Sequence, residues 1–99
     1  MRHAIAQAAA GVRQEVNQLL DELEYQWGRL PTVAAEIDTW EWVDQAVFIE
    51  EWPLEEDRLA RLERYVAADQ LSPEQRARYE ALVRLIAQNR PVLRRLQEW

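Results

Sequence analysis

Carboxylates are the only abundant side chains in this sequence that could support acid–base or metal chemistry. Six of them crowd into one segment, which contains no glycine: Glu36, Asp38, Glu41, Asp44, Glu50 and Glu51. A metal site in a helical bundle uses Glu-x-x-His pairs, but His3 is the only histidine in the chain. A calcium loop needs closely spaced oxygen ligands around a glycine. We therefore predict no metal and no cofactor, and interpret these acids as a solvated face.

Nucleophilic and phosphate chemistry also lack their usual residues. The chain has no cysteine, and its two glycines, Gly11 and Gly28, belong to no Gly-x-Gly phosphate loop. The sequence therefore predicts a protein that is not an enzyme. The absence of cysteine fits a reducing compartment, and no apolar run reaches the ~20 residues that span a bilayer. We expect a cytoplasmic protein without a membrane segment.

The spacing of apolar residues predicts helices, because long stretches run without glycine or proline. The first helix is expected from about residue 4 to residue 27. Gly28 is expected to end it as a left-handed cap, and Pro31 to lie in the first turn of the next helix. The apolar positions of the first helix alternate in gaps of three and four: Ile5, Ala9, Val12, Val16, Leu19, Leu23, Trp27 and Leu30.

The second helix is expected over residues 31–51 and carries two adjacent apolar stripes, which predicts contacts on two sides. The stripes are Ile37, Trp40, Val43 and Val47, and beside them Trp42, Ala46 and Ile49. A short strand over residues 46–49 is the competing interpretation, although no second strand is available to pair with it. Pro53 is expected to start a third helix that ends near Asp69.

The last helix has the clearest start signal, because Ser72-Pro73-Glu74-Gln75 matches a capping box. Its buried positions alternate in gaps of three and four and include Asn89. A polar residue in such a seam can set register or oligomeric state. Alternatively, Asn89 caps a short fifth helix, because Pro91 would interrupt a continuous one. The sequence leaves both interpretations open.

These elements predict an all-α fold: one domain over residues 1–99, a small bundle of about four helices completed by dimerisation. A first helix of ~24 residues would be ~36 Å long, which is long for a domain whose expected radius of gyration is near 13 Å. We therefore expect a homodimer. Its self-association seam is predicted to contain Val12, Val16, Leu19, Leu23, Ile86, Asn89 and Leu93.

Charge is distributed unevenly along the chain. Residues 30–57 contain nine acids and no base, whereas residues 58–99 contain nine arginines and five acids. Either the two blocks neutralise each other within the chain, or the acidic block faces a basic protein partner. Tryptophans in the acidic block could anchor such a partner or belong to the core, and Trp52 and Trp99 are expected to be the most exposed. The predicted partner surface is Trp40, Glu41, Trp42, Asp44, Trp52 and Glu55.

The function predicted from these features is a non-enzymatic helical protein–protein interaction or regulatory module. One alternative is an acidic, antitoxin-like or inhibitor-like partner that neutralises a basic toxin or nuclease. A second is a small DNA-binding regulator that uses the arginine-rich C-terminal helices, with residues 67–72 as the turn of a helix-turn-helix. The isoelectric point near 4.8 opposes phosphate binding, so nucleic acid ranks below a protein partner.

Overall fold

Three long helices, with a short helical connection between the first two, make up the fold. A computed structural model describes the backbone of residues 2–98 and the side chains of residues 8–98. The elements are α1 (Arg2–Gly28), α2 (Leu30–Glu36), the 3-10 turn η1 (Ile37–Thr39), α3 (Trp42–Ala67) and α4 (Pro73–Gln97). The all-α class is thus confirmed, and no strand occurs within residues 2–98. The side chains of His3 and Ile5, and Trp99, lie outside the described residues.

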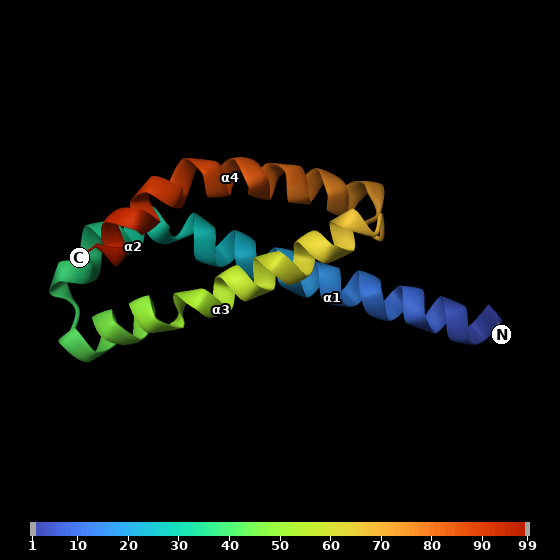
Figure 1. Ribbon diagram of the computed structural model, residues 1–99, viewed down its shortest axis with the longest axis horizontal. Coiled ribbons are helices and arrows are strands. Elements are labelled where there is room, and N and C mark those ends of the chain that lie inside the picture. The colour runs from blue at the N-terminus through green and yellow to red at the C-terminus, as the bar shows by residue number, and fades with distance from the viewer. Residues whose placement is uncertain (1, 99) are drawn as a thin grey trace.

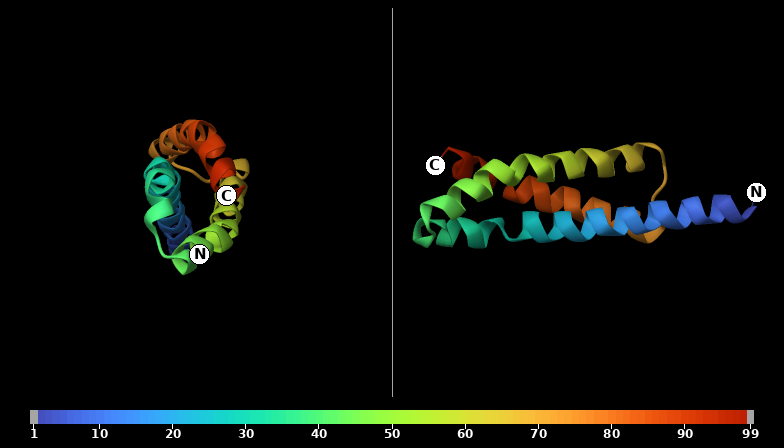
Figure 2. Two further views of the ribbon diagram at one scale, coloured as in Figure 1. Left: turned by 90° about the vertical axis from the view of Figure 1, so that its left-hand side faces the viewer. Right: turned by 90° about the horizontal axis from the view of Figure 1, so that it is seen from below.

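The bundle is elongated, with extents of 55 × 25 × 17 Å and a radius of gyration of 16.1 Å. The long helices lie roughly along the long axis, and the first turns of α1 extend beyond the other helices (Figures 1 and 2). Within the described residues, no helix is both long and apolar enough to cross a membrane. About four helices were predicted; the structure instead has three long ones, and α2 covers only seven residues.

Helix α1 forms where the sequence predicts it, but its end differs from the prediction. Gly28 does not adopt a left-handed conformation, since no glycine among the described residues has a positive φ. The backbone continues almost helically, because Arg29 N–H donates to the Tyr25 carbonyl and Val33 N–H to the Arg29 carbonyl. Pro31 lies in the first turn of α2, as predicted. The chain therefore passes from α1 into α2 with a single interrupting residue.

The predicted helix over residues 31–51 is wrong, because the chain breaks at Trp40 and Glu41. Both residues have extended backbone conformations, with ψ of 153° and 144°. The Gln45 side chain stabilises this break: its Nε2 donates to the Ile37 carbonyl at 2.7 Å and to the Trp40 carbonyl at 3.2 Å. These bonds satisfy backbone acceptors at the end of the preceding turn. The competing strand over residues 46–49 is also wrong, since that segment is helical.

Pro53 lies inside α3 and does not start a new helix. A proline in a helix interior leaves the carbonyl four residues earlier without its donor and costs about 3 kcal/mol. The helix continues because both sides of the proline bury large groups on one face: Phe48 and Trp52 before or at this turn, and Leu59 and Leu62 after it. A break in the helix at Pro53 would turn the buried side chains of one half away from the core. Helix α3 then ends through Asp69, which has a φ of 56° in the left-handed position that usually favours glycine.

Helix α4 begins with the predicted capping box. The Ser72 hydroxyl accepts from Gln75 N–H at 3.1 Å, and Gln75 Oε1 accepts from Ser72 N–H at 3.0 Å. The helix runs through Pro91 to Gln97, so the fifth short helix is not formed. Asn89 is buried and its Nδ2 donates to the Trp27 carbonyl at 2.8 Å. Asn89 therefore joins α4 to α1 and does not cap a separate helix.

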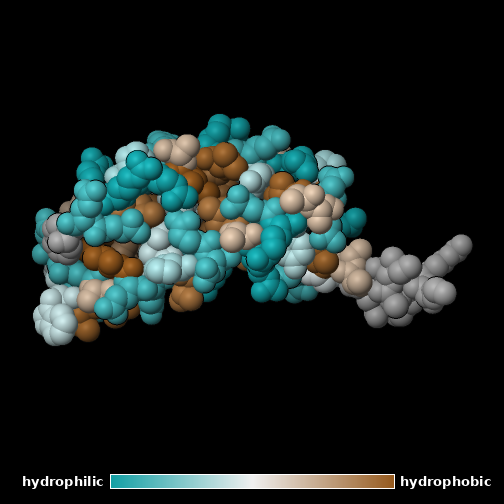
Figure 3. Space-filling view, in the orientation of Figure 1, coloured by the Kyte–Doolittle hydropathy of each residue, from teal (hydrophilic) through white to brown (hydrophobic). Residues whose placement is uncertain are grey.

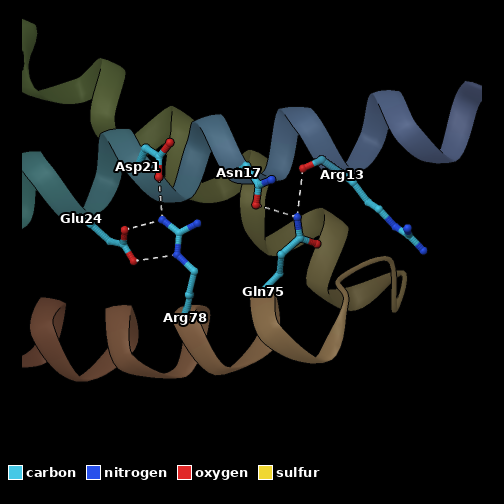
Figure 4. Close-up of polar contacts among 6 residues, drawn as sticks. All are labelled: Arg13, Asn17, Asp21, Glu24, Gln75 and Arg78. Atoms are coloured by element: carbon cyan, nitrogen blue, oxygen red, sulfur yellow. Dashed lines mark hydrogen bonds and ion pairs between the residues drawn. The ribbon is translucent and has the colours of Figure 1, made fainter.

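Polar contacts also set the register between α1 and α4 (Figure 4). Gln75 is buried, and its Nε2 donates to the Arg13 carbonyl and to Asn17 Oδ1, both at 2.9 Å. Two turns of α1 further along, Arg78 forms ion pairs with Asp21 and Glu24 at 2.7 and 2.5 Å. Glu24, and then Asp21, raise the pKa of the Arg78 guanidinium. Around these contacts lies one apolar core drawn from every helix.

Candidate protein-interaction surface

The predicted self-association seam lies inside a single chain. Six of its seven residues are buried, and Val12 is half-buried against the same core: the six are Val16, Leu19, Leu23, Ile86, Asn89 and Leu93. They are buried because α1 and α4 pack against each other along their apolar faces. The regular spacing of apolar residues in α1 and α4 therefore reflects a contact within one chain. These side chains are not available to a second copy.

The tryptophans of the acidic block separate into a buried one, a half-buried one and an exposed one. Trp52, which was expected to be among the most exposed, is only 2 % exposed. Its ring packs edge-on against Trp27, with centroids 5.1 Å apart, and its Nε1 donates to Glu56 Oε1. Trp40 is half-buried, edge-on against Phe48. Trp42 alone is open, with 78 % of its surface exposed. Of the three, Trp42 has the most exposed side chain.

Glu55, another predicted partner residue, is also buried, with 6 % of its surface exposed. Its Oε1 accepts from Arg58 at 2.6 Å, whereas its buried Oε2 has no donor among the described groups. Burial, and then the neighbouring Glu22 carboxyl, raise the pKa of Glu55 to about 7, with Arg58 opposing the shift. A proton on Glu55 shared with Glu22 would satisfy the unpaired oxygen. Glu55 therefore belongs to the α1–α3 contact and not to the partner surface.

The acidic and basic blocks pair with each other only in part. Within the described side chains, Glu55 and Glu56 are the members of the acidic block that form ion pairs, with Arg58 and Arg90. The arginines of the second block pair mainly with acids of α1, which lie outside both blocks: Glu15, Asp21, Glu22 and Glu24. The remaining acids of residues 36–51 form none of the ion pairs found in residues 8–98.

Helix α3 carries a second apolar stripe on the side away from the core, which we call the α3 outer face. Its most exposed apolar side chains are Val43, Val47 and Leu54, at 48, 43 and 52 %, with Trp42 beside them. The stripe continues with spacings of three and four residues, which place its members on one side of the helix. In order, these positions are Val43, Val47, Glu50, Leu54, Asp57, Arg61 and Arg64.

In Figure 3, apolar atoms reach the lower left edge of the molecule, over the first turns of α3, among hydrophilic ones. The acids Glu41, Asp44, Glu50 and Glu51, which form none of the ion pairs described above, lie in the same stretch of chain and are all exposed. The second half of the same face carries three arginines and one acid, and a shallow hollow there is lined by Leu54, Asp57, Arg58, Arg61 and Arg64. The α3 outer face therefore combines exposed apolar side chains with an acidic half and a basic half.

Across the described side chains, no group of three or more acidic, histidine or cysteine residues is placed to hold a metal ion. No protein-family model, curated protein or solved structure matches this chain. Of the residues predicted as a partner surface, Glu41, Trp42 and Asp44 are exposed, and the exposed Val43, Val47 and Leu54 were not part of that prediction. The available signal for these three was their spacing, which continues past Pro53, where a new helix was expected to begin.

Proposed function

We propose that this protein is a non-catalytic, cytoplasmic protein-interaction module that binds its partner through the α3 outer face. The observation that carries the proposal is the exposure of Trp42, Val43, Val47 and Leu54 on one helix whose opposite side already forms the core. Exposed apolar side chains that gather on one face and are rimmed by charge are typical of protein contact sites. Trp42, at the first residue of α3 and next to the stripe in sequence, can supply the anchor that dominates such contacts.

The unpaired acids support a second candidate, an acidic inhibitor-like or antitoxin-like protein that masks a basic toxin or nuclease. Glu41, Asp44, Glu50 and Glu51 are exposed and form no ion pair with the side chains of residues 8–98. Such a cluster attracts a basic protein from a distance and accelerates the encounter. The two candidates share one surface and differ in the partner.

DNA binding receives less support from the charge distribution. Five of the nine arginines in residues 58–99 form ion pairs with carboxylates of this chain: Arg58, Arg61, Arg76, Arg78 and Arg90. Contacts with phosphates would have to compete with these pairs, and the chain as a whole is acidic. We therefore do not propose nucleic acid as the partner.

The proposal is tested by a photo-crosslinking residue at position 47, with position 83 as the matched control. Val47 on α3 and Val83 on α4 are both helical valines, 43 % and 44 % exposed. We expect a specific adduct in the native cell from position 47 and not from position 83. The captured protein should then bind the purified chain, and Trp42→Ala should weaken that binding. Equal labelling from both positions, or no adduct from position 47, would contradict the proposal.

A further inference from the structure

The charge pattern along α3 identifies one partner that fits the whole outer face. We propose that the α3 outer face binds the same face of a second copy of this chain, with the two α3 helices antiparallel. This inference rests on the proposed function, because it uses the same surface and names its partner. It differs from the seam predicted from the sequence, whose residues are buried within one chain.

The first argument is charge complementarity between the two halves of the face. The half before Leu54 carries three acids, Asp44, Glu50 and Glu51, and the half after it carries three arginines, Arg58, Arg61 and Arg64, together with one acid, Asp57. Side by side in a parallel arrangement, two such helices would place acid against acid and arginine against arginine. In an antiparallel pair the acidic half of each copy faces the basic half of the other. Opposite charges across an interface of this kind set orientation and partner choice.

The second argument is the position of Leu54, which lies at the middle of α3 (Trp42–Ala67). A two-fold axis near this residue would bring the two Leu54 side chains close together and bury a side chain that is 52 % exposed in one copy. Glu50 lies ~6 Å before Leu54 along the helix and Arg61 ~10 Å after it, at 1.5 Å per residue. The two residues of opposite copies therefore come to nearly the same level, within reach of an arginine side chain.

A simpler explanation for the charge pattern is the helix dipole, which favours acids at the start of a helix and bases at its end. That effect acts within the first and last turns. Asp44 and Arg64 lie in those turns of α3. Glu50, Glu51, Arg58 and Arg61 lie further inside, where the dipole gives no preference. Arg58 and Arg61 already contact Glu22, Glu55 and Glu15, but their side chains remain 42 and 55 % exposed. Each guanidinium can therefore donate hydrogen bonds to a further carboxylate from a second copy.

The first test is the solution mass of the purified chain from low to high micromolar concentration. We expect a dimer in the wild type, and Leu54→Glu should weaken dimerisation by at least about tenfold, because it places two carboxylates at the centre of the interface. Val83→Glu is the matched control on α4 and should leave the dimer intact. Circular dichroism checks that both variants stay folded. A wild type that is monomeric throughout, or a dimer that Leu54→Glu does not weaken, would overturn the proposal.

The second test uses charge reversal and is independent of the exact register. One chain carries Glu50→Arg with Glu51→Arg, and another carries Arg61→Glu with Arg64→Glu. Each alone should be monomeric, since both halves of its α3 outer face then carry the same sign. An equimolar mixture should form heterodimers, because a basic face meets an acidic one. Failure of the mixture to associate, while both chains are folded, would overturn the antiparallel pairing.

The relative direction of the two α3 helices can be measured by crosslinking introduced cysteines, because the natural sequence contains none. Single-cysteine variants Glu50→Cys and Arg61→Cys, joined by a short bismaleimide, should crosslink to each other in a mixture. Each variant alone should crosslink less well, since Glu50 and its copy lie ~12 Å apart along the axis in an antiparallel pair, and Arg61 and its copy ~21 Å apart. Efficient crosslinking of each variant to itself would indicate a parallel dimer and overturn the proposal.

These outcomes separate the two proposals. A monomeric chain whose position-47 probe captures a different protein would overturn the second copy as partner and leave the proposed function standing. An adduct between two copies at position 47, together with a dimer sensitive to Leu54→Glu, supports both. A dimer that withstands Leu54→Glu, with no adduct from position 47, would overturn both.

Discussion

Asn89 Nδ2 donates a hydrogen bond to the Trp27 carbonyl oxygen, and this contact joins α4 to the end of α1. In a continuous helix that carbonyl would accept from the backbone N–H of residue 31. Residue 31 is Pro31, which has no N–H. The Asn89 amide supplies the donor that the proline removes, inside the core, where an unpaired carbonyl is costly.

Asn89→Ala should therefore destabilise the protein by about 1–3 kcal/mol, because it leaves the buried Trp27 carbonyl without a donor and opens a small cavity. Urea denaturation monitored by circular dichroism measures the free energy of unfolding. Gln88→Ala, at the neighbouring exposed position, should change it by less than about 0.5 kcal/mol. Equal effects of the two substitutions would show that the Asn89–Trp27 contact contributes little.

Glu55→Gln should change how stability depends on pH. The pKa of Glu55 is about 7 in the folded chain and 4.5 in the unfolded one, so between these values the folded state binds more protons. The free energy of unfolding then falls as pH rises through this window. Glutamine keeps the shape without the charge. The variant should match the wild type below pH 4.5 and be more stable above pH 7, by at most about 3 kcal/mol.

Chemical denaturation of both proteins at pH 4, 6 and 8 would measure that difference. Glu51→Gln is the matched control, because it makes the same substitution at an exposed position of the same helix. A wild type that is more stable than Glu55→Gln at pH 8 would mean that the ion pair with Arg58 outweighs the cost of burying the charge.

Gly28→Ala should stabilise the protein by about 0.5–1 kcal/mol, because alanine has less conformational freedom to lose on folding. The backbone of Gly28 is helical, and an added Cβ would meet only Leu85 Cδ2, at an ordinary contact distance of 3.9 Å. Thermal unfolding measures the change. A left-handed cap at this position would give the opposite sign, so a clear loss of stability would contradict the helical passage from α1 into α2.

Gln45→Ala should loosen the turn between η1 and α3 and cost about 1–2 kcal/mol, because two backbone carbonyls lose the donor that joins them. Hydrogen exchange should show lower protection of the amides of residues 40–45. Gln14→Ala, an exposed glutamine on α1, should leave both stability and exchange nearly unchanged. Unchanged protection in Gln45→Ala would show that core packing alone holds the turn.

Features that depend on neighbours in sequence could be predicted from the chain alone. The Ser72–Gln75 capping box, the helix over residues 4–27 and the buried positions of α4 follow from hydrogen bonds and apolar spacing within a few residues. The same local information explains the all-α class, since few residues interrupt the apolar periodicity.

Only the tertiary structure decided where the second helical segment breaks and which residues are exposed. Pro53 stays within α3 because the packing of Trp52 against Trp27 stabilises a continuous buried face. The break at Trp40 and Glu41 is stabilised by Gln45, whose side chain donates to the carbonyl of Ile37, eight residues earlier. Glu55 is buried and Trp42 exposed because of how α3 packs against α1. Composition and spacing determine which residues can form a helix and an apolar face; which face is covered depends on partners distant in sequence.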